Sequence, residues 1–369
     1  MRKVKFEDVA TRVNTREDKD NTSLLYYVGG DHIESGEMVV HNRGLIAGST
    51  IGPMFYFGFK KGDILLVSRN PHLRKASMVN FDGICSEKTF VIGTKDESVL
   101  LQRYLAVVVQ TDSFWNYCEE HKSGGVNFFV NWSTLAKYEF ELPDIVEQRI
   151  ISDKVWAAYE VKESYRKLIS ATDEIVKSRF IEQFDKCQRQ QLSSLSASWD
   201  KGQPFKKESI VDDGETSCIH YGELFTKYGP IIDAVSSLTN EIMIKESKTG
   251  DILFPASDVT PNGLARCSAV MCDKILLGGD IIVLRLREGM SPEYVSYAIN
   301  MQKEQLIRRV TGSVVRHMSA KNLKSVEIPL PSIQEQLLFV ELVRQADKSK
   351  FELKQAIEKI DKVMRALMQ

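Results

Sequence analysis

The run Leu142-Pro143-Asp144-Ile145-Val146-Glu147-Gln148 recurs 188 residues later as Leu330-Pro331-Ser332-Ile333-Gln334-Glu335-Gln336. Further anchors keep this offset: Gly62-Asp63-Ile64-Leu65 with Gly250-Asp251-Ile252-Leu253, and Gly124 with Gly312. Several separated anchors that share one offset are the signature of an internal repeat. The sequence therefore predicts two copies of one structural unit.

A long helix is predicted after each Leu-Pro pair, because apolar residues repeat every seven positions and neither segment contains Pro or Gly beyond its first turn. Subtracting 188 superimposes the two heptad sets, so both helices keep one register. The predicted packing residues are Ile151, Ala158, Val161, Tyr165, Leu168 and Ile175 in the first helix, and Phe339, Leu342, Ala346, Leu353, Ala356, Ile360, Val363 and Leu367 in the second.

About 40 helical residues extend roughly 60 Å, which exceeds what one domain of this size can cover. We therefore expect the two helices to pack antiparallel on each other. The alternative is a pair of unrelated amphipathic helices, each packed on its own domain.

The parts of each half follow the same order. Short β-type runs at 63–67 and 280–284 precede helical segments at 99–117 and 292–310, a glycine loop, and a strand that ends in Leu-Pro. The predicted fold class is α+β, with two tandem mixed α/β domains and a pseudo-two-fold repeat of period 188. The predicted boundaries are 1–143 and 186–331 for the domains, and 144–185 and 332–369 for the long helices.

Composition is that of an ordinary globular protein, with 43% hydrophobic and 27% charged residues among 369. No apolar run is long enough to span a bilayer and no signal peptide is recognisable, so a cytosolic protein is expected. The six cysteines form no CxxC motif and predict reduced thiols without a metal site. The net charge of −1 argues against a simple basic DNA-binding domain, although charge can be segregated to one face.

Over essentially the whole chain, this layout resembles the specificity subunits of type I restriction–modification systems. The motifs that carry the resemblance are Gly62-Asp63-Ile64-Leu65 with Ser68-Arg69, Tyr221-Gly222-Glu223-Leu224 with Thr226-Lys227-Tyr228-Gly229, and the two Leu-Pro…Glu-Gln runs. The first domain departs from the pattern, since Gly29-Gly30-Asp31-His32 stands in place of the Tyr-Gly-Glu-Leu run. The second has Ala256-Ser257-Asp258 where the first has Val67-Ser68-Arg69.

The resemblance implies that each domain is a target-recognition domain that reads one half of a split double-stranded DNA target. The paired helices would act as a spacer and would dock two methyltransferase subunits, which carry S-adenosylmethionine. Restriction subunits that translocate DNA with ATP and Mg would complete the assembly. The chain itself would bind no cofactor.

Loops rich in cations and amides are the candidate DNA contacts, because Arg suits guanine and Asn suits adenine through paired hydrogen bonds. In the first domain they are Arg69, Asn70, His72, Arg74, Lys75 and, from the glycine loop, Lys122. In the second they are Asp258, Thr260, Asn262, Arg266, Arg316 and Lys321. The alternative is a basic surface hairpin in the first domain and a plain turn at 260–263 in the second.

The sequence predicts no catalytic site. It contains no GxxxxGK[ST], HExxH or GxSxG motif, and no Asp/Asn-Pro-Pro-Tyr/Phe run of adenine methyltransferases. Pro143-Asp144 with Glu160-Val161-Lys162 matches the spacing of a PD…ExK nuclease, but one helix would hold these carboxylates roughly 24 Å apart. The competing hypotheses are a coiled-coil adaptor that does not read DNA and a divergent nuclease or methyltransferase.

Overall fold

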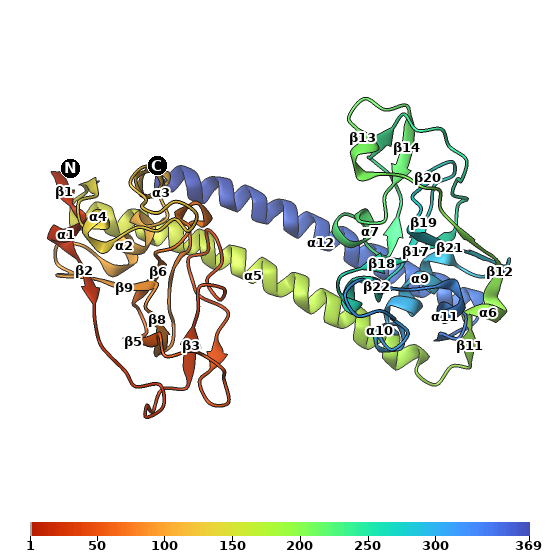
Figure 1. Cartoon of the computed structure of the whole chain (residues 1–369), viewed down its shortest axis with the longest axis horizontal. Helices are drawn as coiled ribbons and strands as arrows, with labels where there is room; N and C mark the ends of the chain where they lie inside the picture. Colours follow the sequence, from red (N-terminus) through yellow and green to blue (C-terminus); the bar gives the residue numbers. More distant parts are fainter. Residues whose placement is uncertain (1) are drawn as a thin grey trace. The chain divides into compact units, whose positions relative to one another are not determined.

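Each Gly-Asp-Ile-Leu run leads into an inner strand that pairs antiparallel with both of its neighbours, at the same place in both halves of the chain. The computed structural model describes residues 2–369. It divides into two units, Met1–Leu168 with Leu353–Gln369, and Ile169–Glu352. The long helices α5 (Ile145–Phe184) and α12 (Ile333–Met368), drawn in Figure 1, are each divided between the two units.

Two small sheets form the framework of the first unit. Its elements before α5 are β1 (Arg2–Lys5), α1 (Phe6–Val9), β2 (Ala10–Val13), β3 (Tyr26–Val28), β4 (Gly44–Leu45), β5 (Phe55–Phe59), β6 (Ile64–Val67), the 3-10 turn η1 (Pro71–Leu73), β7 (Ala76–Met78), β8 (Gly83–Ser86), β9 (Thr89–Thr94), α2 (Gln102–Val108), α3 (Asp112–Glu120), α4 (Trp132–Leu135) and β10 (Glu139–Leu142). One sheet is antiparallel with strand order β2-β9-β6-β7. The other has order β4-β3-β8-β5, with β3 and β8 parallel.

The second unit repeats this framework. Its elements between α5 and α12 are β11 (Arg189–Gln191), α6 (Leu192–Leu195), β12 (Ser196–Lys201), the 3-10 turn η2 (Lys207–Ser209), β13 (Ile210–Val211), β14 (Thr216–Ile219), α7 (Glu223–Thr226), β15 (Ile231–Ile232), β16 (Leu238–Thr239), β17 (Asp251–Pro255), β18 (Ser257–Asp258), α8 (Pro261–Leu264), β19 (Ser268–Val270), β20 (Leu276–Leu277), β21 (Ile281–Leu286), α9 (Pro292–Asn300), α10 (Lys303–Ile307), β22 (Arg316–His317), α11 (Ala320–Leu323) and β23 (Glu327–Pro329).

Strand pairing shows that the two units share most of their topology, although the second sheet of the second unit has the order β13-β16-β14-β20, with its parallel pair at one edge. The order β12-β21-β17-β19-β15 matches β2-β9-β6-β7 with one added strand. The parallel pair β14–β20 matches β3–β8, and β11–β23 matches β1–β10. The predicted α+β class, with duplicated mixed domains and two long helices, is confirmed.

The Gly-Asp pair makes the same turn in both units. Gly62 has φ +97° and Gly250 has φ +91°, a left-handed conformation that glycine adopts without a steric penalty. The Asp63 carboxylate accepts a 2.7 Å hydrogen bond from the backbone N–H of Lys60, and Asp251 accepts an equivalent bond of 2.8 Å. The recurrence of Gly-Asp in the sequence therefore reflects a turn that each inner strand requires.

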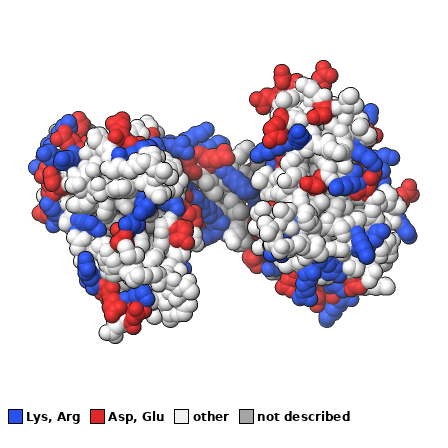
Figure 2. All heavy atoms as spheres, viewed as in Figure 1, with Lys and Arg blue, Asp and Glu red and all other residues white. Residues whose placement is uncertain are grey.

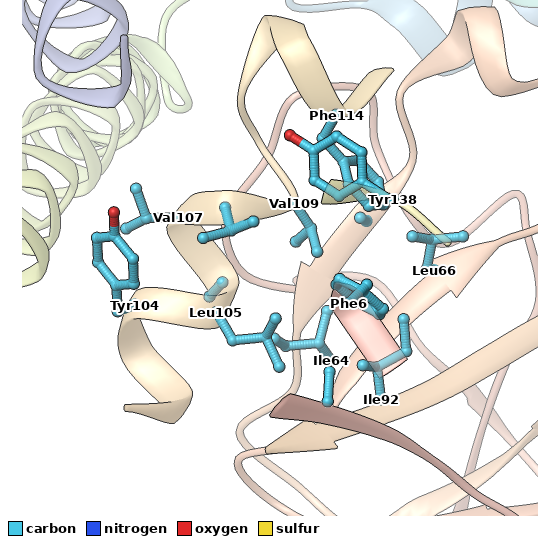
Figure 3. Close-up of a cluster of buried hydrophobic side chains, with 14 of the residues drawn as sticks. Phe6, Ile64, Leu66, Ile92, Tyr104, Leu105, Val107, Val109, Phe114 and Tyr138 are labelled. Carbon is cyan, nitrogen blue, oxygen red and sulfur yellow. The ribbon is translucent and has the colours of Figure 1, made fainter. Parts of the chain in front are cut away.

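The first core lies between the antiparallel sheet and the helices that follow it. Figure 3 shows Phe6, Ile64, Phe114 and Tyr138 converging from α1, β6, α3 and the segment before β10. The rings of Phe114 and Tyr138 meet edge to face, with centroids 5.2 Å apart, a favourable geometry for aromatic pairs. Phe114 and Trp115 are buried in this core, so they are not available as a base-stacking surface.

The glutamine of each Leu-Pro…Glu-Gln motif ties a long helix to the rest of its unit. Gln148 is fully buried; its amide oxygen accepts from the backbone N–H of Leu101, the residue that precedes α2. Gln336 accepts from the N–H of Ser291, which precedes α9, and both amides also donate to the carbonyl of the motif proline. The motif is thus a buried hydrogen-bonding joint, which explains its duplication.

Within each unit, the segments of α5 and α12 pack on each other. In the first unit, Lys162 pairs with Asp361 at 2.8 Å. In the second, Lys350 pairs with Asp173 at 2.6 Å, and Phe180 packs on Phe339. In the second unit, residue numbers that rise along α5 as they fall along α12 establish the antiparallel direction. The alternative of two helices that pack only on their own domains is not supported.

The predicted packing residues lie only in part on the buried face of the helices. Ile151, Ala158, Phe339, Ala346, Ile360 and Leu367 pack against the cores, Leu342 does so partly, and Tyr165, Leu353 and Ala356 are half-buried. Four of the predicted packing residues are instead exposed: Val161, Leu168, Ile175 and Val363. The buried positions lie one residue later, at Lys162, Val176 and Met364. Hydrophobic periodicity misses this face because charged side chains occupy part of it.

None of the helices within residues 2–369 combines the length and the apolarity that crossing a lipid bilayer requires.

Candidate nucleic-acid interface

In the first unit, the candidate interface consists of two loops that are joined by backbone contacts. Loop 68–75 leaves β6 through η1, and loop 122–130 follows α3. Arg69 forms an antiparallel bridge with Phe129, and the N–H of Asn70 donates to the carbonyl of Phe128 at 2.9 Å. Asn70 and Arg74 have φ near +50°, so two left-handed residues bracket η1. These contacts hold a short, irregular basic segment in one shape.

The side chains of this interface fall into two groups. Arg74 forms an ion pair with Asp112, Lys75 donates to the carbonyl of Gly30 at 2.6 Å, and Lys122 pairs with Glu119 at 2.7 Å. The structure therefore uses these three cations internally. The remaining candidates Arg69, Asn70 and His72 make no side-chain hydrogen bond or ion pair with any residue in the range 2–369, so they are the candidates available to a ligand.

The second unit builds the same interface with different side chains. Strands β18 and β22 pair Ser257 with His317 and Asp258 with Arg316, joining loop 256–266 to loop 308–321. Thr260 caps α8 by accepting from the N–H of Gly263, and its hydroxyl donates to Asp258 at 2.8 Å.

Two cations of this second interface are also engaged. Arg266 donates to the carbonyl of Phe225 at 2.8 Å, and Arg316 donates to that of Gly312. Over the described part of the chain, the side chains of Asn262 and Lys321 have no hydrogen-bond or ion-pair partner. Asn262 and Lys321 are therefore the available candidates here.

One repeated geometry relates the two interfaces. The bridge Arg69–Phe129 corresponds to Ser257–His317, and Ser123–Phe129 corresponds to Thr311–His317, each residue displaced by 188. Sequence reasoning identified the loops, but it did not show that the loops of each unit pair with one another. The structure places the exposed His317 at the position that corresponds to Phe129 by the repeat offset.

The glycine loops require glycine at one position. Gly124 and Gly312 have φ +98° and +93°, and a Cβ on Gly124 would lie 2.6 Å from the carbonyl oxygen of Asn127. We expect Gly124→Ala to lower the free energy of unfolding by about 1–2 kcal/mol, the cost of a left-handed conformation for an L-residue. Urea unfolding monitored by fluorescence measures the change.

Gly125→Ala is the matched control, since Gly125 is not in a left-handed conformation and a Cβ there meets nothing within 4 Å. Equal effects of the two substitutions would contradict the explanation from backbone strain.

On the face that Figure 2 shows, charge does not single out an interface. In the view of Figure 2, Lys and Arg are interspersed with Asp and Glu over both units, in line with the net charge of −1. Selection of a DNA site at these loops would therefore depend on individual side chains more than on a broad basic field.

No metal is proposed for the chain. Among residues 2–369, Glu37, His41 and Glu163 lie close enough to hold one ion. Arg166, however, donates to Glu37 at 2.7 Å and to Glu163 at 2.8 Å, so protein cations already neutralise both carboxylates. All six cysteines are free thiols.

The nuclease-like spacing does not form a site. The Asp144 carboxylate accepts hydrogen bonds from the N–H groups of Val146 and Glu147, and so it caps the start of α5. Glu160 and Lys162 lie further along the same helix, at a distance of roughly 24 Å by helix geometry. This placement agrees with the prediction that one helix keeps the two carboxylates far apart.

Comparison with known protein families finds a match for the second unit. The family model described as type I restriction modification DNA specificity domain matches residues 189–362. This matched segment includes loops 256–266 and 308–321, and the first unit shares most of its topology. The resemblance found in the sequence is therefore supported by a family match in the second unit.

Solved structures share the fold of this chain over its whole length. A chain from a study of complex assembly and conformational transition of the type I R-M system is 17% identical, with TM-score 0.58, covering 100% of this chain and 96% of that one. The type I restriction–modification S subunit from M. genitalium is 12% identical, with TM-score 0.57, covering 100% and 94%. No curated protein sequence matches the chain.

Proposed function

We propose that each unit reads one half of a bipartite double-stranded DNA target through its paired loops. The observation that carries the proposal is the repeated bridge, Arg69–Phe129 in one unit and Ser257–His317 in the other. The same backbone frame thus presents different side chains, as two readers of different sequences require. Arg69 and Asn70 have the geometry for guanine and adenine edges in the first unit, and Asn262 does for adenine in the second.

The partners follow from the role. The exposed apolar residues of the long helices, including Ile150, Ile175 and Leu338, are suited to dock two methyltransferase subunits. S-adenosylmethionine would be held by those subunits, and ATP and Mg by restriction subunits that join the complex. The side chains of this chain would position the DNA and would supply no chemistry.

Mapping of methylated adenines tests the DNA-reading role. Cells that express the chain with its methyltransferase partner should show modified adenines in a split motif whose two halves are separated by unread base pairs. A motif without a gap, or modification unrelated to sequence, would contradict the proposal. A coiled-coil adaptor would give no chain-dependent motif.

We further propose that the helices set the gap between the half-sites. Duplicating residues 165–171 and 352–358 adds one heptad to each helix and so preserves the packing register. It lengthens each helix by about 10 Å, or roughly three base pairs. The expected result is an altered gap with both half-site sequences unchanged, read out by methylated-adenine sequencing.

Lengthening α5 alone is the control, since it puts the two helices out of register and should reduce modification. A half-site sequence that changes when both helices are lengthened would refute the spacer role.

A further inference from the structure

Two valines stand at the tips of the glycine loops, and the proposed base-reading side chains do not account for them. Val126 is 91% exposed and Val314 is 81% exposed. The two positions differ by 188, so they are the same position of the repeated unit. Single apolar residues on a surface are common. A recurrent one at the tip of both candidate DNA-binding loops is a separate observation.

The loops hold these tips in a fixed conformation. Each valine follows a left-handed glycine by two residues, Gly124 or Gly312. The Ser123–Phe129 and Thr311–His317 bridges close the loops behind the tips. Valine itself is β-branched and has few side-chain conformers to lose when it becomes buried. Each loop therefore presents a preorganised apolar point to whatever it meets.

The surroundings of each tip are suited to DNA. In the first unit, the tip loop is joined to Arg69 and Asn70, whose side chains are available, and Lys122 lies over the ring of Phe128 at 4.4 Å. In the second unit, Arg316 closes the tip loop through the carbonyl of Gly312. An apolar point beside base-reading side chains would reach the base pairs when these side chains do.

We propose that Val126 and Val314 are apolar wedges, each of which enters the base stack at one step of one half-site and kinks the duplex there. Proteins that insert apolar side chains between base pairs unstack the step and bend the duplex. The inference rests on the proposed function, because it assigns one wedge to each half-site. It adds a source of specificity that does not depend on hydrogen bonds to bases, since some base steps unstack more easily than others.

The test uses the chain in complex with its methyltransferase partner and the duplex target identified by methylation mapping. 2-Aminopurine is placed at successive steps of each half-site in turn, because its fluorescence rises when it is unstacked. Wild-type protein should raise the signal at one step in each half. Val126→Ser should abolish the rise in one half only, and Val314→Ser in the other, and each should raise Kd roughly tenfold. Val126→Ile should keep both properties.

Ile242→Ser is the matched control, since Ile242 is 82% exposed but lies outside the candidate loops; it should leave both readouts unchanged. Unaltered fluorescence and Kd in the valine variants would overturn the wedge role while leaving DNA reading intact. So would an affinity loss that replacing a thymine by uracil reproduces with no unstacking signal, since that indicates contact with a methyl group in the groove. If the wild-type complex does not distinguish target from scrambled duplex, the proposed function fails and the wedge fails with it.

Discussion

Glu37→Ala is expected to lower the free energy of unfolding of the first unit by about 3 kcal/mol, near the lower end of the cost of breaking a buried ion pair. The Glu37 side chain is almost fully buried and accepts from Arg166 at 2.7 and 2.9 Å and from Lys162 at 3.3 Å. Lys162 is also buried. When the Glu37 carboxylate is removed, the remaining partner of Lys162 is the half-buried Asp361, whose carboxylate lies 2.8 Å from the Lys162 ammonium. That remaining pair keeps the expected loss below the upper limit for an uncompensated charge.

The contacts of Glu37 with Arg166 and Lys162 also predict that stability depends on pH. Burial alone would raise the pKa of Glu37, but hydrogen bonds and charges from Arg166 and Lys162 outweigh it, so the pKa lies below the ordinary value. A carboxyl with a lowered folded-state pKa stabilises the fold above its unfolded pKa, about 4.3. This contribution is lost as pH falls through the folded-state value. Wild-type stability should therefore decline below about pH 4.3 more steeply than that of Glu37→Ala.

Urea unfolding at several pH values measures both effects. Glu182→Ala is the matched control, because it removes an exposed ion pair with Arg179 and should change stability by less than about 1 kcal/mol. Similar losses for the two variants would show that burial does not strengthen the Glu37 cluster. Equal slopes for wild type and Glu37→Ala below pH 4.3 would argue against the lowered pKa.

Arg69→Ala is expected to weaken DNA binding by about 1–3 kcal/mol, the discrimination that a two-bond contact with guanine provides. The Arg69 backbone is fixed by its bridge to Phe129. Its side chain has no hydrogen-bond or ion-pair partner among residues 2–369. Besides the hydrogen bond from Lys88, its charge helps to lower the pKa of Glu87, but no hydrogen bond within the described residues holds the guanidinium in place. Titration of the target duplex with the methyltransferase complex measures the loss, and methylated-adenine sequencing should show relaxed selection at one base of one half-site.

Arg103→Ala is the control, since Arg103 is an arginine of the same unit that lies on α2 and contacts Trp156 and Asp153. It should leave the half-site unchanged. Normal affinity and an unchanged half-site for Arg69→Ala would remove Arg69 from the interface. A loss that is uniform across sequences would reassign it to phosphate contact.

The sequence by itself determined the duplication, the fold class and the ends of the long helices. These features rest on local chemistry that recurs at a fixed offset. Gly62 and Gly250 mark left-handed turns, and the repeated glutamines mark helix joints. Sequence also located the four loops, because cations, amides and glycines cluster there.

Only the tertiary structure decided which helix face is buried and which loop side chains remain available. The buried face includes Lys162, whose partner Glu37 lies 125 residues away in the chain, so hydrophobic periodicity displaced the packing set by one residue onto Val161. In the same way, the Asp112 that occupies Arg74 and the Phe129 that fixes Arg69 belong to distant segments. Such pairings depend on how the chain folds back on itself, and no short-range pattern encodes them.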